Sequence, residues 1–201
     1  MLRIVSAACL TAFLLAASRA PAASEGDWPC IQRKVGELTA AQMWDGPELA
    51  TAAPWRDDPR IASLAAELAQ RRMPLDEAAS HIERFALAAG ADRDAQLTAL
   101  FARVLDRINA ERGRLVAGIE RYARKQRELA ERIRAVSLAI ATPGGDAPRH
   151  AAPSPDLEEQ LRWDTRIYDE RQASLAYVCE SPVLLEQRAF ALAREIRNHL
   201  E

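Results

Sequence analysis

The fold is decided by residues 92–141, which read DRDAQLTALFARVLDRINAERGRLVAGIERYARKQRELAERIRAVSLAIA and contain no proline. Apart from two gaps, which Glu111 and Gln126 fill, apolar side chains recur at steps of three or four residues, namely Leu97, Phe101, Val104, Ile108, Leu115, Ile119, Tyr122, Leu129, Ile133, Val136 and Ile140. The average step is about 3.6 residues, which is the period of an α-helix. We therefore expect one helix of about 48 residues and about 70 Å, continuous through Gly113 and Gly118.

A helix of this length needs a packing partner, and the chain supplies one after a linker at residues 142–155 that contains four prolines and two glycines. Beyond the linker, spacings of four and three residues predict a second helical stripe, which Pro182 is expected to interrupt before the helix resumes at Val183. The arms, about 92–141 and 156–200, have matching lengths. This predicts an all-α fold built on a long antiparallel helical hairpin.

Charge supports this pairing, because folding back at the linker sets the mostly basic residues 121–134 opposite the mostly acidic residues 156–171. Two short helices are expected to precede the hairpin. The first begins at Asp58-Pro59, where an N-cap is followed by proline at the first helical position. The second follows a break at Met73-Pro74 and is expected to stop at Gly90.

The first 22 residues have the pattern of a secretory signal peptide, with a basic start, an apolar stretch from Ile4 to Ala17, and an A-x-A site at residues 20–22. An uncleaved membrane anchor is the alternative, although the apolar stretch is short for one. We expect residues 1–22 to be a signal peptide, residues 23–57 an irregular strap and residues 58–201 a helical domain. The protein is then periplasmic or secreted, with no membrane span after cleavage.

Loss of the signal peptide would also change the net charge and the number of cysteines. Removal of Arg3 and Arg19 with the signal peptide would change the net charge from −2 to −4, which argues against a nucleic-acid partner. Cys9 would leave with the signal peptide, so Cys30 and Cys179 remain in an oxidising compartment and are expected to form a disulfide that braces the strap. Cys179 is expected beside residues 113–118, where a close crossing of the strap would explain the two glycines.

The strap contains three of the four tryptophans and several prolines and glycines, with one short helix expected near residues 39–44. Tryptophans could cover the apolar faces of the helices as a lid, or they could anchor a partner protein. For the second alternative, the partner surface is predicted at Trp44, Gly46, Pro47 and Trp55.

No pattern in the sequence indicates catalysis. The three histidines are scattered, neither mature cysteine belongs to a C-x-x-C pair, and no nucleotide-binding or hydrolase motif is present. We expect no catalytic residues, no cofactor and no metal ion.

The stretch Leu38-Thr39-Ala40-Ala41-Gln42 resembles the Leu-Thr-x-x-Gln motif of periplasmic helical chaperones of the spheroplast-protein-Y type. That resemblance implies an exported helical protein that cradles unfolded clients or responds to envelope stress. The local alternative is a capping box, in which Thr39 and Gln42 close the start of a helix. Separately, Asp27-Trp28-Pro29-Cys30, Gln42-Met43-Trp44 and Gly46-Pro47 resemble the start of uncharacterised exported proteobacterial proteins, which implies the cell envelope and no activity.

Three hypotheses for function follow from the sequence. The first is a periplasmic helical scaffold or adaptor that binds an envelope protein. The second is a chaperone-like or envelope-stress protein, and the third is an enzyme with an unrecognised site.

Overall fold

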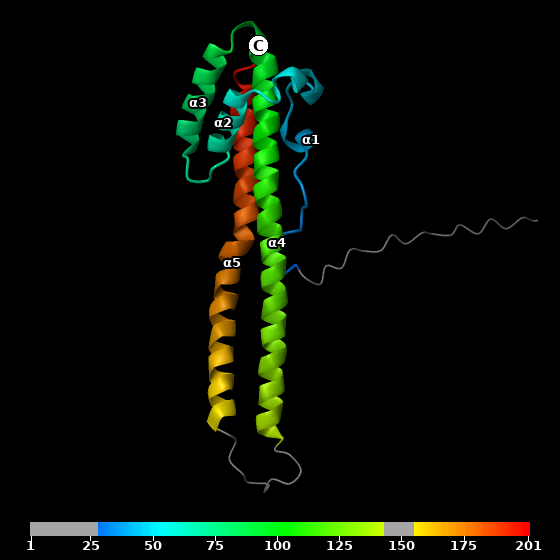
Figure 1. Cartoon of the computed structure of the whole chain (residues 1–201), viewed down its shortest axis with the longest axis vertical. Helices are drawn as coiled ribbons and strands as arrows, with labels where there is room; N and C mark the ends of the chain where they lie inside the picture. Colours follow the sequence, from blue (N-terminus) through cyan, green and yellow to red (C-terminus); the bar gives the residue numbers. More distant parts are fainter. Residues whose placement is uncertain (1–27, 143–154) are drawn as a thin grey trace, which may run out of the picture.

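The computed structural model describes residues 28–142 and 155–201, so the expected signal peptide and most of the linker lie outside the described residues. Two long helices, α4 (Arg93–Ala141) and α5 (Pro155–Arg197), run antiparallel and side by side along the whole molecule (Figure 1). The predicted hairpin is therefore confirmed, and α4 is continuous through Gly113 and Gly118.

Both predicted short helices are present, as α2 (Pro59–Leu68) and α3 (Leu75–Ala88). The Asp58 side chain accepts a hydrogen bond of 2.8 Å from the backbone N–H of Arg60, which confirms the N-cap. Gly90 adopts a φ of 65° just past the end of α3, a conformation that glycine reaches without the strain of a Cβ, and a short 3₁₀ turn, η3 (Gly90–Asp92), then leads into α4.

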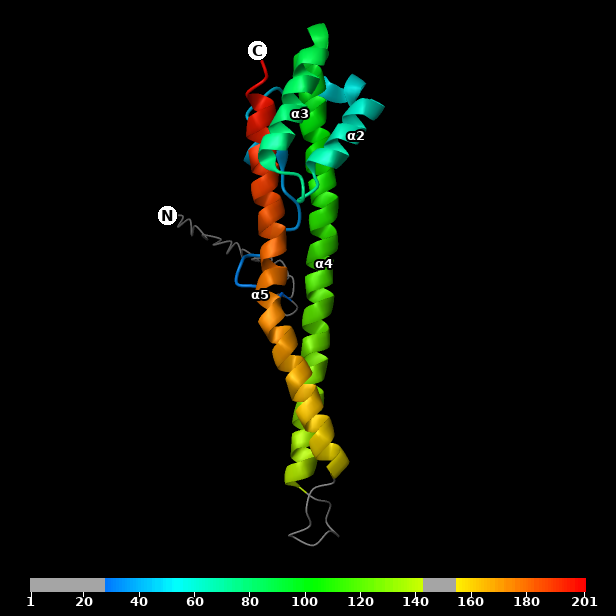
Figure 2. The ribbon, with the colours of Figure 1, turned by 90° about the vertical axis from the view of Figure 1, so that its left-hand side faces the viewer.

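The strap holds the short helix α1 (Ala40–Met43), as predicted, and a 3₁₀ segment, η2 (Leu49–Trp55), that was not predicted. Helices α2 and α3 pack on one side of the α4–α5 pair and α1 lies on the other, all near the C-terminus (Figures 1 and 2). We call this end, residues 38–108 and 185–200, the head. We call the remainder of the two long helices, residues 112–141 and 155–182, the stalk.

Nearly all of the large, fully buried apolar side chains belong to the head. They include Ile61, Leu68, Ile82, Leu97, Leu100, Phe101, Ile108, Leu185, Leu192 and Ile196. The stalk buries only the seam between its two helices, so the hydrophobic contribution to stability per residue is larger in the head.

The seam of the stalk departs from the predicted stripe from Glu111 onward, because Arg112, Val116 and Ala123 are buried where Glu111, Leu115 and Tyr122 were predicted. Glu111 was expected to fill the gap between Ile108 and Leu115, but Arg112 is the residue buried there. The seam of α4 then continues through Val116, Ile119, Ala123, Gln126, Leu129 and Val136. With the half-buried Ile133 between Leu129 and Val136, the eight steps from Ile108 to Val136 average about 3.5 residues, which is the repeat of a coiled coil rather than of the straight stripe that was predicted.

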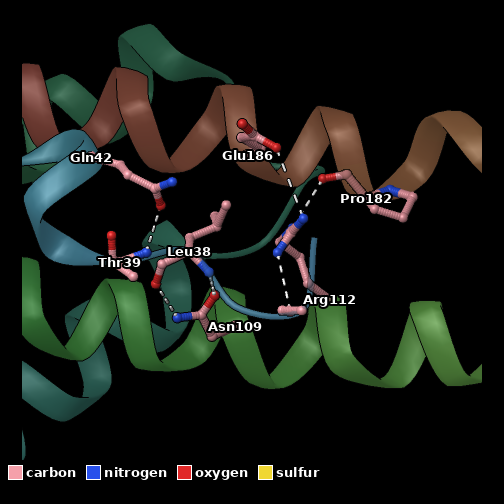
Figure 3. Close-up of polar contacts among 8 residues, drawn as sticks. Leu38, Thr39, Gln42, Asn109, Arg112, Pro182 and Glu186 are labelled. Atoms are coloured by element: carbon pink, nitrogen blue, oxygen red, sulfur yellow. Dashed lines mark hydrogen bonds and ion pairs between the residues drawn. The ribbon is translucent and has the colours of Figure 1, made fainter. Parts of the chain in front are cut away.

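Arg112 is buried because the strap and α5 converge on its guanidinium group (Figure 3). Its Nε donates to the backbone oxygen of Pro182 on α5 at 3.3 Å, and Nη1 donates to the backbone oxygen of Gly36 in the strap at 3.5 Å. Glu186 lies 3.8 Å from Nη2. Burial lowers the pKa of Arg112, and the Glu186 carboxylate partly offsets that effect.

One turn before Arg112, the side-chain amide of Asn109 holds the strap against α4. It accepts a hydrogen bond from the backbone N–H of Leu38 and donates one to the Leu38 carbonyl, both at 2.9 Å (Figure 3). Further along α4, toward its C-terminal end, Glu120 forms an ion pair with Lys34 of the strap. The Gln42 side chain accepts from the Thr39 backbone N–H at 2.9 Å, and the predicted capping box is present.

Cys30 and Cys179, which are 149 residues apart, form the predicted disulfide between strap and α5. Cys179 lies on α5 between two hydrogen bonds that join the long helices, from Arg112 to the Pro182 carbonyl and from Tyr122 to the Arg171 carbonyl. It therefore lies beside residues 113–118 of α4, as predicted. The explanation offered for the glycines is wrong, however. A Cβ added to Gly113 would meet no atom within 4 Å, so the strap makes no close crossing there.

Pro182 does not interrupt α5, contrary to prediction, although proline removes one backbone hydrogen bond from a helix. Packing against α4 explains this tolerance, because Pro182 is buried in the seam and the hydrogen bond from Arg112 to its carbonyl fixes α5 at this level. Neighbouring contacts on both sides, at Cys179 and at the buried Leu185, also fix the helix here. Tertiary packing thus outweighs the local preference for a break.

The expected pairing of basic and acidic stretches is seen at Arg132 and Asp164. Nε and Nη2 of Arg132 donate to the two carboxylate oxygens of Asp164 at 2.7 and 2.8 Å. Asp164 is buried in the seam while Arg132 stays half-exposed. These hydrogen bonds hold the pKa of Asp164 below its ordinary value.

Because this pKa is lowered by folding, the ionised Asp164 stabilises the native state above its unfolded pKa, and the stabilisation is lost as the pH falls. Replacement of Asp164 by Asn should therefore reduce the free energy of unfolding at pH 7, and the deficit should shrink below about pH 4. Urea unfolding at several pH values would measure it. A deficit that is constant from pH 7 to pH 2.5 would contradict this role for the carboxylate.

Replacement of both disulfide cysteines by Ser should lower the free energy of unfolding by at most about 5 kcal/mol, because the bridge closes a loop of nearly 150 residues in the unfolded chain. Denaturant unfolding would measure the change. Wild-type protein treated with reductant is the control and should show a similar loss. A melting temperature that reductant leaves unchanged would show that the bridge contributes nothing to stability.

Candidate partner surface

Three of the four predicted partner-surface residues lie together, and they form a small packed unit of the head. The Trp44 ring stacks on Phe101 of α4, with ring centroids 4.3 Å apart and ring planes inclined by 7°. Its Nε1 donates to the Pro47 carbonyl at 2.8 Å. A Cβ on Gly46 would come within 2.5 Å of the Trp44 ring, so the glycine is needed for this close approach.

The fourth residue, Trp55, ends η2 and packs against the same core cluster. Both tryptophans are partly buried, whereas Pro47 is exposed. The geometry of Trp44 favours the lid alternative, because its ring covers Phe101 and its polar nitrogen is satisfied within the strap.

Helix α5 carries a second set of large apolar side chains, and these face solvent. Trp163, Tyr177 and Leu184 are 61%, 78% and 43% exposed. They stand at residues 163, 177 and 184 and share one position of the heptad repeat, which the exposed Glu170 occupies between Trp163 and Tyr177. Each directly precedes a residue of the α5 seam, namely Asp164, Val178 and Leu185. One residue corresponds to about 100° of helical rotation, so all three project along the same flank of the stalk. We call them the α5 stripe.

The stripe leads into a cavity under the head. This cavity, of about 940 Å³, lies where the α2–α3 connection meets α4 and α5, and Leu184 is part of its wall. Leu75, Leu185, Ala66 and Ala69 add further apolar surface. Its charged lining residues are five arginines and one glutamate: Arg71, Arg72, Arg107, Arg114, Arg188 and Glu111. We call it the arginine cavity.

Arg188 is the most buried of these arginines, at 8% exposure. Its Nε donates to the Leu68 carbonyl at 2.7 Å and Nη1 to the Met73 carbonyl at 2.8 Å, which ties α5 to the α2–α3 connection. Its Nη2 is buried and has no hydrogen-bond partner in the described part of the chain. Burial lowers the pKa of Arg188.

The chemistry of the other described residues is limited. Within residues 28–142 and 155–201, no group of three His, Cys, Asp or Glu side chains is placed to hold a metal ion. None of the helices that the structure describes combines the length and hydrophobicity needed to cross a bilayer.

Comparisons with protein-family models, with curated proteins and with solved structures find no match for this chain. The geometry of the two surfaces therefore provides the basis for a functional proposal.

Sequence reasoning missed both the α5 stripe and the arginine cavity. Part of the signal for the stripe was available, because Trp163 and Tyr177 each stand one position before a residue of the predicted helical stripe, Asp164 and Val178, and Leu184 follows Tyr177 by seven residues. The cavity left no such signal, since its arginines come from the α2–α3 connection, α4 and α5.

Replacement of Trp44 by Ala should cost about 3–5 kcal/mol of stability, because it removes the stacked ring over Phe101. The matched control is Trp163→Ala, which removes an exposed ring and should change stability by less than about 1 kcal/mol. Thermal or urea unfolding would compare them. Equal effects at the two positions would contradict the assignment of Trp44 to the core.

Proposed function

We propose that this protein is an exported helical scaffold or adaptor, which acts by binding another protein along the α5 stripe. The observation that carries the proposal is the solvent exposure of Trp163, Tyr177 and Leu184 at one heptad position of a long helix. Tryptophan and tyrosine are the residues most enriched at the energetic centres of protein interfaces.

The spacing of the stripe favours a helical partner. From Trp163 to Leu184 the chain rises about 32 Å, which matches a partner helix of about 21 residues. An amphipathic helix that lies in a groove contacts its partner through anchors at such regular intervals. The stalk supplies a stiff platform, because both of its helices are continuous past the glycines and past Pro182.

The disulfide helps to explain why this flank is available. Cys179 directly follows the seam residue Val178, whereas Tyr177 directly precedes it, so the two side chains leave α5 in opposite directions. The strap is bonded to Cys179. It therefore covers the flank opposite the stripe.

The test is affinity capture with the mature, oxidised protein as bait and the extracytoplasmic fraction of its own cells as the source. The Trp163→Ala/Tyr177→Ala double variant should capture at least tenfold less of the partner than the wild-type protein does, because it lacks both aromatic anchors. The matched control is Phe190→Ala, since Phe190 is 45% exposed on α5 but lies off the stripe. Mass spectrometry and quantitative immunoblotting would measure the captured partner.

Capture that survives the double variant would contradict the proposal. The chaperone alternative gives a different result. A chaperone would suppress the aggregation of several unrelated unfolded proteins, whereas an adaptor is expected to retain one partner and to leave such aggregation unchanged.

A further inference from the structure

We infer that the arginine cavity binds carboxylates of an acidic protein segment, and that this segment belongs to the partner that lies on the α5 stripe. This inference rests on the proposed function and adds the chemistry by which the partner is recognised.

The first argument is the charge of the cavity. Its lining carries five arginines against the single carboxylate of Glu111, although the chain as a whole has a net charge of −2. Glu111 is already engaged by Arg114, whose Nη2 lies 2.6 Å from its carboxylate. Arg107 has no hydrogen-bond or ion-pair partner among the described residues. The cavity thus concentrates positive charge that the surrounding protein does not neutralise.

The second argument is the unused donor of Arg188. More than nine-tenths of this side chain is buried, and two of its nitrogens bond to backbone carbonyls. The third, Nη2, is left without a partner in the described chain, which is costly for a buried charged group. A carboxylate entering the cavity would supply the negative charge that this buried guanidinium lacks, and the other arginines of the lining would present forks that suit a carboxylate.

The third argument is continuity between the cavity and the stripe. Leu184 belongs to both, so a helix seated on Tyr177 and Leu184 would bring its end to the cavity. On α4, Arg107 and Arg114 line the cavity, and Arg121 follows them at the same seven-residue spacing. All three are exposed. A partner helix would therefore lie between apolar anchors on α5 and a row of arginines on α4, which matches an acidic amphipathic helix.

The experiment uses the mature oxidised protein and two synthetic amphipathic helices of about 21 residues. Both peptides have leucines at the a and d positions of the heptad, and one has glutamates where its twin has glutamines. Isothermal titration calorimetry should show that the glutamate peptide binds at least tenfold more tightly than its twin. The difference should shrink as salt is raised, because the contacts are between charges.

Two variants locate the binding site. Arg107→Gln should weaken binding of the glutamate peptide about tenfold, since it removes a cavity arginine that forms no hydrogen bond or ion pair among the described residues. Arg84→Gln removes an exposed arginine of α3 outside the cavity and should leave binding unchanged. Arg107 is preferred to Arg188 for this test because Arg188 also anchors the α2–α3 connection.

The outcomes separate this inference from the proposed function. Equal affinity for the two peptides, or insensitivity to Arg107→Gln, would overturn the acidic partner while leaving capture through Trp163 and Tyr177 to stand. Capture that survives loss of the stripe would instead overturn the proposed function. A dimer in sedimentation equilibrium that Trp163→Ala abolishes would place a second copy of this chain on the stripe and would also overturn the inference.

Discussion

The architecture depends on the burial of one cation, Arg112, at the junction of head and stalk. Its guanidinium group contacts the strap at Gly36 and α5 at Pro182 and Glu186, so a single side chain of α4 connects all three segments. A buried guanidinium needs its hydrogen bonds, because an unsatisfied charge in the interior is expensive. The strap and the middle of α5 must therefore keep the positions that satisfy it, and the disulfide at Cys179 lies within one turn of Pro182.

The hairpin could be predicted from the sequence because the information that specifies it is local. Continuous helical periodicity, the N-cap at Asp58 and the glycine after α3 each act within one or two turns of the chain. The disulfide could be predicted because only two cysteines lie outside the expected signal peptide. The choice of Arg112 over Glu111 in the seam could not, since it depends on carbonyl groups 70 residues away in α5 and 76 residues away in the strap. The continuity of α5 through Pro182 depends on the same distant contacts.

The candidate surfaces, too, could be predicted from the sequence only where local spacing specifies them. The tryptophans of the strap were visible in the sequence, but whether they face the core depends on Phe101, which the strap meets only in the folded chain. The α5 stripe follows from heptad spacing, so its existence could be read from residues 163–184 once the seam was known. The arginine cavity could not, because a charge cluster assembled from separate elements has no spacing in the sequence.

The two flanks of the stalk show how a two-helix structure can be both stable and available for binding. A helix pair buries only one stripe per helix, so its flanks stay open unless another segment covers them. In this protein the strap covers one flank, held there by Cys30, Lys34 and Asn109. On the other flank, α2 and α3 cover only the head, where Arg188 ties them to α5. Below that contact no described segment of the chain covers Tyr177 and Trp163 of α5, which are exposed. A third helix placed there would complete the arrangement that α2 and α3 begin, and this is the physical reason to expect a helical partner.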